Sequence, residues 1–415
     1  MATTTLLSQY INDGIINIPQ DAQIDKKLLI EAFLLEVAQG TISFPYKKLF
    51  MRDNDEKFEQ LIIYKPVITN EPFDISRFIN KKVGKLNYNK YKGEYLCFVA
   101  QEEDYDNIDI LTDYFTDDQR MAARNKKSTM SPIDLWKSKE ALSKLLNKMI
   151  DDKEVITSYN IRENIYKLKY ECNSFKLTLA SSIYWLFNAK KILDISAGWG
   201  DRLLAAIAHY ADRYLGVDPN TDLIKGHTDI IKTLTLHRDT SALKNKYEVA
   251  PFKFESPELI LDREEFDLIF TSPPYFDLEI YTDQDGQSIA SFPDFPSWLI
   301  NFLFVSLKKA WNSLTIGGNM VIHIQDFERY SIIEPMILFV LGWCDGSNYD
   351  GMIGSKAIHS GGNYSAIRPM WVFSKDSRRS SQNEDFGRRS LEENYNNLFI
   401  NPDFNFIFIM NVLKL

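Results

Sequence analysis

The alternation of apolar strands with helical segments between about residues 155 and 375 constrains the fold of this chain most. Four short apolar runs have the length and composition of buried strands: Lys191 to Ile195, Tyr214 to Asp218, Phe266 to Thr271 and Asn319 to Ile324. Helical stretches such as Leu203 to Tyr210 separate them, and right-handed crossovers of this kind connect parallel neighbours. The pattern therefore predicts a doubly wound α/β domain with a mostly parallel sheet.

The rest of the chain predicts two further regions around this core. At 415 residues, the chain exceeds the length of one typical domain. Residues 1–152 mix short apolar runs with charge clusters, which favours an additional N-terminal α+β domain with an accessory or substrate-recognition role. Residues 153–375 form the core domain, and residues 376–415 hold a polar linker and an Asn-rich, aromatic C-terminal tail.

Charge is unevenly distributed along the chain. The formal net charge of -9 argues against nucleic-acid binding through the overall electric field. The stretch from Arg120 to Lys148, however, holds eight basic residues against two acidic ones, a net charge of +6. Such a strip can contact phosphates, and it is equally consistent with a solvated helical surface.

Three cysteines, Cys97, Cys172 and Cys344, lie far apart in the sequence. No pair has a metal-ligand spacing, and an odd number does not suggest a disulfide framework, so a reducing, intracellular setting fits best. The N-terminal residues show no secretory signal, and the apolar tail from Phe404 to Leu415 is too short to span a bilayer. We therefore expect no membrane contact and a location in the cytoplasm or, for a viral or eukaryotic protein, in the nucleus.

The run from Asp194 to Arg202 is the first candidate site. It joins a strand to a helix and carries Gly198 and Gly200, which let the backbone pass close to a ligand, while the helix N-terminus offers free N–H groups. In an open α/β sheet, ligands bind at the carboxyl ends of the strands, where this turn falls. Asp218, about 20 residues further on, ends the next strand and can accept both hydroxyls of a ribose.

Taken alone, this Gly-x-Gly turn is a weak signal for a nucleoside site. The third glycine of the dinucleotide-binding fingerprint is absent, since Leu203 occupies its place. A strand-turn-helix unit that binds no ligand therefore stays an open alternative.

The segment from Thr271 to Phe276, with the sequence TSPPYF, is the second and stronger candidate site. Two consecutive prolines directly after a buried strand are rare, because neither can donate to the sheet ladder. They stiffen the backbone and leave carbonyl groups pointing into a cleft. The Ser272 hydroxyl and the Pro273 carbonyl can accept the two protons of an amino group on a planar base, and Tyr275 can stack on its ring.

Methyl transfer to such an amino group is the chemistry that this arrangement favours. The nitrogen lone pair is delocalised into the ring, and drawing the protons toward two acceptors lets the nitrogen rehybridise and attack a methyl carbon in line. Most of the help is then orientation and electrostatics, without a strong base or a covalent enzyme intermediate. A proline-terminated strand edge without activity is the alternative.

Together, these motifs resemble those of class I S-adenosylmethionine-dependent DNA amino-methyltransferases, which form N6-methyladenine or N4-methylcytosine. The run from Asp194 to Gly200 is similar to the cofactor motif of that family, Asp218 to its ribose-binding acid, and Thr271 to Tyr275 to its catalytic motif. The sequence around both motifs looks like phage- and virus-type DNA methyltransferases. The resemblance covers about residues 170–375 and implies a seven-stranded methyltransferase sheet, S-adenosylmethionine as cofactor and DNA as partner.

The resemblance also implies roles for individual residues. The catalytic residues would be Ser272, Pro273, Pro274 and Tyr275. The cofactor contacts would be Phe175, Asp194, Ser196, Ala197, Gly198, Gly200, Arg202, Asp218, Pro219, Glu255 and Thr271. The expected substrate contacts are Phe276, Arg120, Arg124, Lys126, Lys127, Lys356 and Arg368. For Phe175 a plain packing role, and for Glu255 an exposed loop position, are equally consistent. No metal ion is expected, because the five histidines are scattered.

Two features leave the target base open. Ser272 stands where adenine-specific enzymes of this family usually carry Asp or Asn, and Ser is more frequent in cytosine-N4 enzymes. The cofactor motif, however, precedes the catalytic motif, whereas many cytosine-N4 enzymes have the reverse order. An RNA base or a protein glutamine presents a similar planar amine, and a non-catalytic cofactor-binding module is a further alternative.

Overall fold

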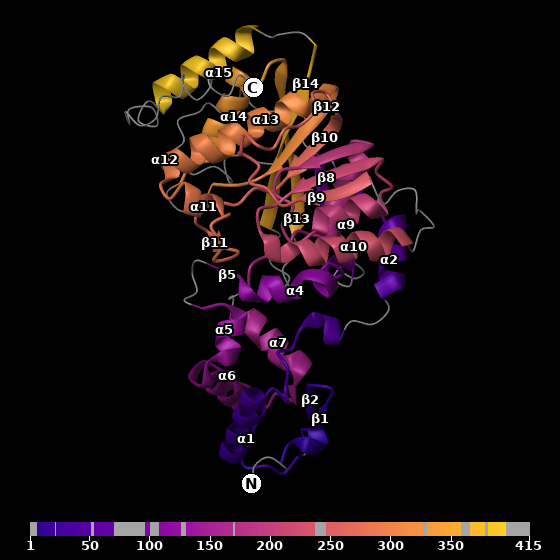
Figure 1. Cartoon of the computed structure of the whole chain (residues 1–415), viewed down its shortest axis with the longest axis vertical. Helices are drawn as coiled ribbons and strands as arrows, with labels where there is room; N and C mark the ends of the chain where they lie inside the picture. Colours follow the sequence, from indigo (N-terminus) through magenta and orange to yellow (C-terminus); the bar gives the residue numbers. More distant parts are fainter. Residues whose placement is uncertain are drawn as a thin grey trace. The chain divides into compact units, whose positions relative to one another are not determined.

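The computed structural model describes residues 6–20, 22–50, 54–69, 96–99, 108–125, 130–168, 171–236, 246–326, 330–357, 366–377 and 381–395. Its helices and strands, shown in Figure 1, form two compact units that are interleaved in the sequence. The small unit comprises Met1–Asn54, Thr112–Asn173 and Asp277–Asp283. The sheet unit comprises Asp55–Leu111, Ser174–Phe276 and Gln284–Leu415.

The sheet unit is built on one large sheet with the strand order β3-β4-β13-β14-β12-β10-β7-β8-β9. The strands are β3 (Val67–Thr69), β4 (Leu96–Val99), β7 (Lys191–Asp194), β8 (Arg213–Val217), β9 (Tyr247–Ala250), β10 (Phe266–Thr271), β12 (Leu314–His323), β13 (Ser347–Ala357) and β14 (Ala366–Lys375). Strands β12, β10, β7, β8 and β9 are mutually parallel, and β14 is antiparallel to both β12 and β13.

The part of this sheet from β13 to β9 contains seven strands and confirms the predicted doubly wound, mostly parallel architecture. Strands β8 and β9 lie on one side of β7, and β10 and β12 lie on its other side. This reversal creates a switch point between β7 and β10, and open α/β sheets bind ligands at the carboxyl ends of their strands at such a point. Both sequence motifs directly follow these two strands, so they lie at this edge of the sheet.

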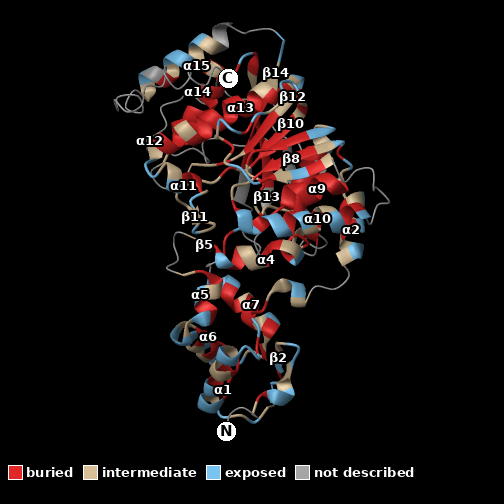
Figure 2. Ribbon diagram, viewed as in Figure 1, coloured by how far each residue is buried: buried red, intermediate tan, exposed pale blue. Residues whose placement is uncertain are grey.

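Helices cover both faces of the sheet, whose central strands are buried (Figures 1 and 2). The helices of one group pack against one another: α8 (Leu177–Leu186), α9 (Asp201–Ala208) and α10 (Ile224–Leu236). The second group consists of α13 (Val305–Ser313), α14 (Ile333–Trp343) and α15 (Ser381–Asn394). This second group shares one apolar core with the sheet, and the core includes the buried side chains of Trp298, Trp311 and Trp371.

Helices α14 and α15 approach each other closely at a pair of glycines. A Cβ atom on Gly387 would lie 2.5 Å from the backbone nitrogen of Gly342, a distance that real side chains do not reach. Arg388 donates a hydrogen bond from Nε to the Gly342 carbonyl at 2.7 Å. The C-terminal region, to which the sequence assigned no task, thus adds a helix to the sheet unit.

A wide helical turn precedes α13. Phe295–Ser297 forms α12, and Trp298–Phe304 forms the π-helical segment η7 between α12 and α13. The Trp298 ring is fully buried and contacts the ring of Phe276, the residue that follows the TSPPY motif, at a centroid distance of 5.7 Å. The π-helical segment thereby supports the loop that carries this motif. The unit further contains α2 (Asn54–Ile63), η5 (Thr221–Leu223) and α11 (Ser288–Ser291).

The small unit mixes helices with short strands, as expected for an α+β domain. Its elements are η1 (Ser8–Tyr10), β1 (Ile11–Asn12), β2 (Ile15–Ile18), α1 (Lys26–Gln39), η2 (Lys47–Leu49), α4 (Asp113–Ala122), β5 (Arg124–Asn125), α5 (Pro132–Lys137), α6 (Lys139–Asp151), β6 (Ile156–Thr157), α7 (Ser158–Lys167) and β11 (Glu279–Ile280). Strands β1, β2 and β6 form one sheet, and β5 pairs with β11. The unit has its own apolar core, which includes Phe33, Trp136 and Met149.

The compact units interleave along the chain, whereas the sequence suggested contiguous domains with boundaries near residues 152 and 375. That division stays a prediction. Strand β11 lies in Asp277–Asp283, which belongs to the small unit although the residues on both sides of this segment belong to the sheet unit. Within the described ranges, the structure contains no helix with the length and apolar character needed to cross a membrane.

Candidate functional site

The turn that follows β7 has the open backbone expected of a nucleoside site. Gly198 and Gly200 have φ angles of 57° and 101°, in the left-handed region that favours glycine. A Cβ atom on Gly200 would lie 2.7 Å from Ile230 Cδ1, so a larger residue here would force the Ile230 side chain to move. A Cβ atom on Gly198 would meet no described atom closer than the Ser196 carbonyl oxygen at 3.9 Å, so the space beside Gly198 is open.

Asp218 lies directly after β8 and supports the same turn. Its carboxylate accepts hydrogen bonds from the backbone N–H groups of Gly198 and Asn220 at 2.8 and 3.0 Å. Burial raises the pKa of Asp218 to about 6, although both N–H groups act in the opposite direction. The carboxyl group therefore gains its full charge, and its full strength as a hydrogen-bond acceptor, only near neutral pH.

The side chain of His227 on α10 supports the turn by binding the backbone of Gly198. Its Nε2 atom lies 2.8 Å from the Gly198 carbonyl oxygen, so the ring donates from Nε2. Burial lowers the pKa of His227 to about 4, although the Gly198 carbonyl acts in the opposite direction. The ring is therefore neutral near pH 7. Sequence analysis did not single out His227, because its contact with the glycine turn joins residues that are 29 positions apart.

Asp194 and Arg202, two expected cofactor contacts, pair with each other inside the sheet unit. Both side chains are almost fully buried, and 2.6 Å separate Arg202 Nε from Asp194 Oδ2. Tyr214 donates its hydroxyl proton to the same oxygen at 2.9 Å, and Arg202 also donates to the Ser196 carbonyl. These contacts stabilise the turn from within, and a direct contact of either residue with a cofactor stays a prediction.

Phe175 contacts side chains that lie close to the glycine turn and to the TSPPY motif. The Arg202 guanidinium lies 5.0 Å from the centre of the Phe175 ring, which is a cation–π distance. The ring also meets Phe270 of β10 and His323 of β12 edge-on, with centroid separations of 5.6 and 5.3 Å. Phe175 therefore packs against side chains of α9, β10 and β12 and is half-buried, while its expected contact with a cofactor stays a prediction.

Two hydroxyl groups join the first motif to the second. Ser196 Oγ lies 2.8 Å from Thr271 Oγ1 and donates to the Ser272 carbonyl oxygen at 3.1 Å. Thr271 is fully buried at the end of β10, and Ser196 follows β7. Because β7 and β10 are hydrogen-bonded neighbours, the sheet order brings these side chains together.

The hydroxyl groups of Ser272 and Tyr275 converge on a histidine that sequence analysis passed over. Ser272 Oγ lies 3.1 Å and Tyr275 Oη lies 2.9 Å from His323 Nδ1. His323 ends β12, and Thr271 pairs with Ile322 in the parallel register of β10 and β12. The next residues of these two strands, Ser272 and His323, are therefore neighbours. The available signal was a histidine near the carboxyl end of an expected strand.

Four further expected residues lie around these groups. Pro273 is buried and Pro274 is half-buried after the end of β10. Ala197 is buried within the glycine turn. Pro219 follows Asp218 and packs so closely on Gly286 that a Cβ atom there would lie 2.9 Å from Pro219 Cβ. The structure thus places all four at the carboxyl edge of the sheet, while their predicted contacts with ligands stay predictions.

Glu255 follows β9 in a half-buried loop. Burial raises its pKa above the ordinary value. Lys309 on α13 donates to the carbonyl oxygens of Phe254 and Ser256, the two neighbours of Glu255, and burial lowers the pKa of Lys309 to about 8. Glu255 is therefore more enclosed than the exposed loop acid that the sequence left open.

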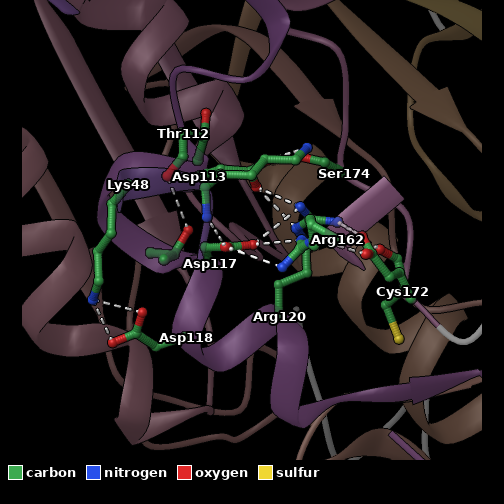
Figure 3. A network of polar contacts seen from close by, with 12 residues as sticks. Lys48, Thr112, Asp113, Asp117, Asp118, Arg120, Arg162, Cys172 and Ser174 are labelled. Atoms are coloured by element: carbon green, nitrogen blue, oxygen red, sulfur yellow. Dashed lines mark hydrogen bonds and ion pairs between the residues drawn. The ribbon is translucent and has the colours of Figure 1, made fainter. Parts of the chain in front are cut away.

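Arg120, expected on a basic surface strip, lies instead inside the small unit (Figure 3). Its guanidinium contacts Asp113 at 2.7 Å, Asp117 at 3.3 Å and Glu171 at 3.0 Å. Arg162 binds Asp117 and Glu171 as well, each at 3.0 Å. Arg120 therefore does not lie on the surface as a phosphate contact, as the sequence predicted, because its buried guanidinium is paired with three carboxylates.

Phe276 was expected to touch the substrate, and the structure gives its ring a packing role. Its φ angle is 50°, and the residue is 4% exposed. It meets the rings of Phe295, Trp298 and Tyr330 at centroid distances of 5.5, 5.7 and 5.0 Å. These contacts hold the ring in the apolar core of the sheet unit.

The other expected substrate contacts are basic residues outside the two motifs. Arg124 is exposed on β5. Lys126 and Lys127 lie outside the described residues. Lys356 and Arg368 lie in the antiparallel ladder of β13 and β14, and only their backbone belongs to the described part of the chain. Their contacts with a substrate stay predictions.

No protein-family model and no curated protein sequence matches this chain. Solved structures similar to it include a SAM-dependent O-methyltransferase from Thermotoga maritima, at 12% identity over 52% of this chain and 71% of that chain, with a TM-score of 0.30. An O-methyltransferase from a polyketide multienzyme of Brevibacillus brevis, in complex with S-adenosyl-L-homocysteine, shows 10% identity over 50% of this chain and 74% of that chain, with a TM-score of 0.31. The methyltransferase domain of bacterial CtHen1-C shows 12% identity over 48% of this chain and 97% of that chain, with a TM-score of 0.32. Because these values are low, the assignment of the fold rests on the strand order.

Proposed function

We propose that this chain is an S-adenosylmethionine-dependent methyltransferase that acts on the exocyclic amino nitrogen of a DNA base. The observation that carries the proposal is the link between the two motifs. Ser196 of the glycine turn contacts both Thr271 and the Ser272 carbonyl at the end of β10. A cofactor in the turn and an amine at Ser272 would then meet at the same edge of the sheet, as direct transfer requires.

The residues after β7 and β8 fit S-adenosylmethionine. The open space and positive φ at Gly198 allow a ligand to lie against the backbone, and the N-terminus of α9 follows directly. Asp218 ends the neighbouring strand with a carboxyl group that can accept hydrogen bonds from ribose hydroxyls. Bound there, the cofactor would supply an electrophilic methyl group.

The residues after β10 fit a planar amine. The half-buried Ser272 hydroxyl and the Pro273 carbonyl would accept hydrogen bonds from the amino group, and the half-buried Tyr275 ring would stack on the base. These groups orient the nitrogen lone pair toward the methyl carbon, and they exclude part of the surrounding water. A base in duplex DNA would have to leave the stack to reach them.

DNA as the substrate is supported by the surface of the small unit. Five basic side chains of the strip are exposed: Arg124, Lys137, Lys139, Lys144 and Lys148. Such side chains can neutralise phosphates and release counterions, so DNA binding should weaken as the salt concentration rises. A protein-glutamine substrate would show little of this salt dependence.

The test is methyl transfer from labelled S-adenosylmethionine to unmodified DNA and RNA by the purified full chain, followed by nucleoside mass spectrometry. The Tyr275→Ala variant should lose activity, because the stacking ring is removed. Tyr166 lies on α7 and is 61% exposed, so the Tyr166→Ala variant provides a matched control and should keep activity.

Label in N4-methylcytosine or N6-methyladenine of DNA, lost in Tyr275→Ala and kept in Tyr166→Ala, would support the proposal and name the base. Label in RNA alone would overturn the DNA assignment. Transfer to neither polymer, with S-adenosylmethionine bound, would overturn nucleic-acid methylation as the function. No binding of S-adenosylmethionine would overturn the cofactor assignment as well.

A further inference from the structure

His323 Nδ1 is shared by two hydroxyl groups of the TSPPY motif. Ser272 Oγ lies 3.1 Å from it and Tyr275 Oη lies 2.9 Å from it. Tyr275 Oη also lies 3.3 Å from the His323 carbonyl oxygen, to which it can donate. The phenol thus has two acceptors on the same residue, one on the ring and one on the backbone.

The number of protons limits how these contacts can be arranged. A neutral imidazole with its proton on Nε2 has one lone pair on Nδ1, which accepts one hydrogen bond well. When the Tyr275 hydroxyl donates to the His323 carbonyl, Nδ1 is left to accept from Ser272. The Ser272 oxygen then keeps its lone pairs directed away from the ring, where an amino group can donate to them.

The reaction of the proposed function releases one proton. The amino nitrogen forms a bond to the methyl carbon while the carbon–sulfur bond breaks, and the sulfur keeps the electron pair of that bond. The methylated nitrogen carries a positive charge until it loses one of its protons. A site that has excluded water needs an acceptor for that proton within hydrogen-bond reach.

We propose that His323 accepts this proton through Ser272, and that Tyr275, whose hydroxyl donates to the His323 carbonyl, holds this residue in the position that makes the relay possible. This inference rests on the proposed function. The amino group passes a proton to Ser272 Oγ as the Ser272 hydroxyl proton passes to His323 Nδ1, so an imidazolium and a neutral methylamino group result. His323 acts through Ser272 and is therefore a positioning residue in the relay. The proton leaves His323 to solvent after transfer.

The surroundings of His323 suit a ring that gains charge only transiently. Phe175 meets the imidazole edge-on at a centroid distance of 5.3 Å, and the neighbouring strand β14 pairs Met370 with His323. Among the described residues nearest the imidazole, the titratable and charged groups include Tyr275 after β10, Arg202 on α9 beyond the Phe175 ring, and Asp326 after β12. Asp326 accepts from the backbone of Ile332 and Ile333, and Arg202 is paired with Asp194.

The experiment compares His323→Gln, Ser272→Ala and the double variant with the wild-type protein, using the methyl-transfer assay and a pH series. Glutamine can accept a hydrogen bond but cannot take up the proton. We expect His323→Gln to lower kcat about 100-fold, in the range of general acid–base catalysis, with KM for both substrates nearly unchanged. His209→Gln is the matched control, since His209 lies at the C-terminus of α9, away from the two motifs.

Two further readouts separate a relay from a purely structural role. At saturating S-adenosylmethionine, where protonation of Asp218 does not limit cofactor binding, the wild-type kcat should fall at low pH, because an imidazolium cannot accept a proton. The kcat of His323→Gln should lack this fall. In the Ser272→Ala background, His323→Gln should cause little further loss, because the relay is already broken. Independent losses in the double variant, or a pH profile that is the same in wild type and His323→Gln, would overturn the relay.

Failure of this inference is distinguishable from failure of the proposed function. Wild-type protein that transfers methyl groups, with His323→Gln equally active, would overturn the relay and leave the proposed function intact. Wild-type protein that transfers no methyl group to any nucleic acid would overturn both. A His323→Gln protein that melts far below the wild type would show a structural role, and free imidazole that restores the rate of His323→Ala would support the relay even then.

Discussion

Ser196 and Thr271 join the ends of two adjacent strands through their side chains, with 2.8 Å between the two hydroxyl oxygens. Ser196 has one hydroxyl proton, which it donates to the Ser272 carbonyl at 3.1 Å, so Thr271 must be the donor to Ser196. The resulting chain of hydrogen bonds runs from Thr271 through Ser196 to Ser272. It couples the position of the TSPPY motif to the position of the glycine turn.

Removing the hydroxyl of Ser196 should therefore misplace Ser272. We expect Ser196→Ala to lower kcat about 5-fold, because a lost hydrogen bond of ~1 kcal/mol relaxes the geometry needed for transfer. Thr271→Val removes the other hydroxyl and keeps the bond from Ser196 to the Ser272 carbonyl, so its effect should be smaller. Steady-state kinetics of both variants provide the test, and a larger loss in Thr271→Val would contradict this order of hydrogen bonds.

The raised pKa of Asp218 predicts a pH-dependent stability. Because its pKa rises from 3.8 to about 6 on folding, the carboxyl stabilises the fold when protonated, and this contribution is lost as the pH rises toward 6. The free energy of unfolding of the wild type, relative to Asp218→Asn, should fall by up to ~3 kcal/mol between about pH 4 and pH 6. Urea unfolding of both proteins between about pH 4 and about pH 7.5 measures this difference.

The same carboxyl should make cofactor binding depend on pH in the opposite direction. The ionised form accepts hydrogen bonds from ribose hydroxyls more strongly, so the affinity for S-adenosylmethionine should rise as the pH passes about 6. Asp218→Asn should bind weakly at every pH. A stability difference that does not change with pH would show that the folded-state pKa of Asp218 is ordinary.

Gly200 and Gly317 allow backbone strain and steric contact to be separated. Both have a positive φ, 101° and 80°, but a Cβ atom meets Ile230 Cδ1 at 2.7 Å only at Gly200, whereas no described atom lies within 4 Å at Gly317. We expect Gly317→Ala to lower the free energy of unfolding by about 1 kcal/mol, and Gly200→Ala by roughly 1–2 kcal/mol more. Thermal unfolding tests this, and equal losses would mean that Ile230 moves aside freely.

The buried ion network of the small unit should be far more sensitive to substitution than the surface pairs beside it. Arg120→Met leaves three carboxylates without this partner and should cost about 3–5 kcal/mol of unfolding free energy. Lys48→Met removes an exposed pair with Asp118, 2.8 Å apart, and should cost less than about 1 kcal/mol. Denaturant unfolding compares them, and a mild effect of Arg120→Met would contradict a structural role for this network.

Much of the fold could be predicted from local patterns. The strands around Ile192, Leu215 and Ile269 are short apolar runs, and strands with helical connections in this order form a doubly wound sheet. The glycine turn, Asp218 and the two prolines were also identifiable, because special backbone geometry and strand ends depend on residue types that are close in sequence.

Other features depend on contacts between residues that are distant in sequence. The burial of Arg120 could not be read from a run of basic residues, because one of its three carboxylate partners, Glu171, is 51 positions away in the sequence. His323 lies 51 positions from Ser272, and only the register of β10 and β12 brings the two together. The sequence by itself determined the strand-helix order and the two motifs, since these follow from periodicity and local backbone preferences. The tertiary structure alone decided which charges are buried and which histidine faces the motif, since both depend on strand register and packing.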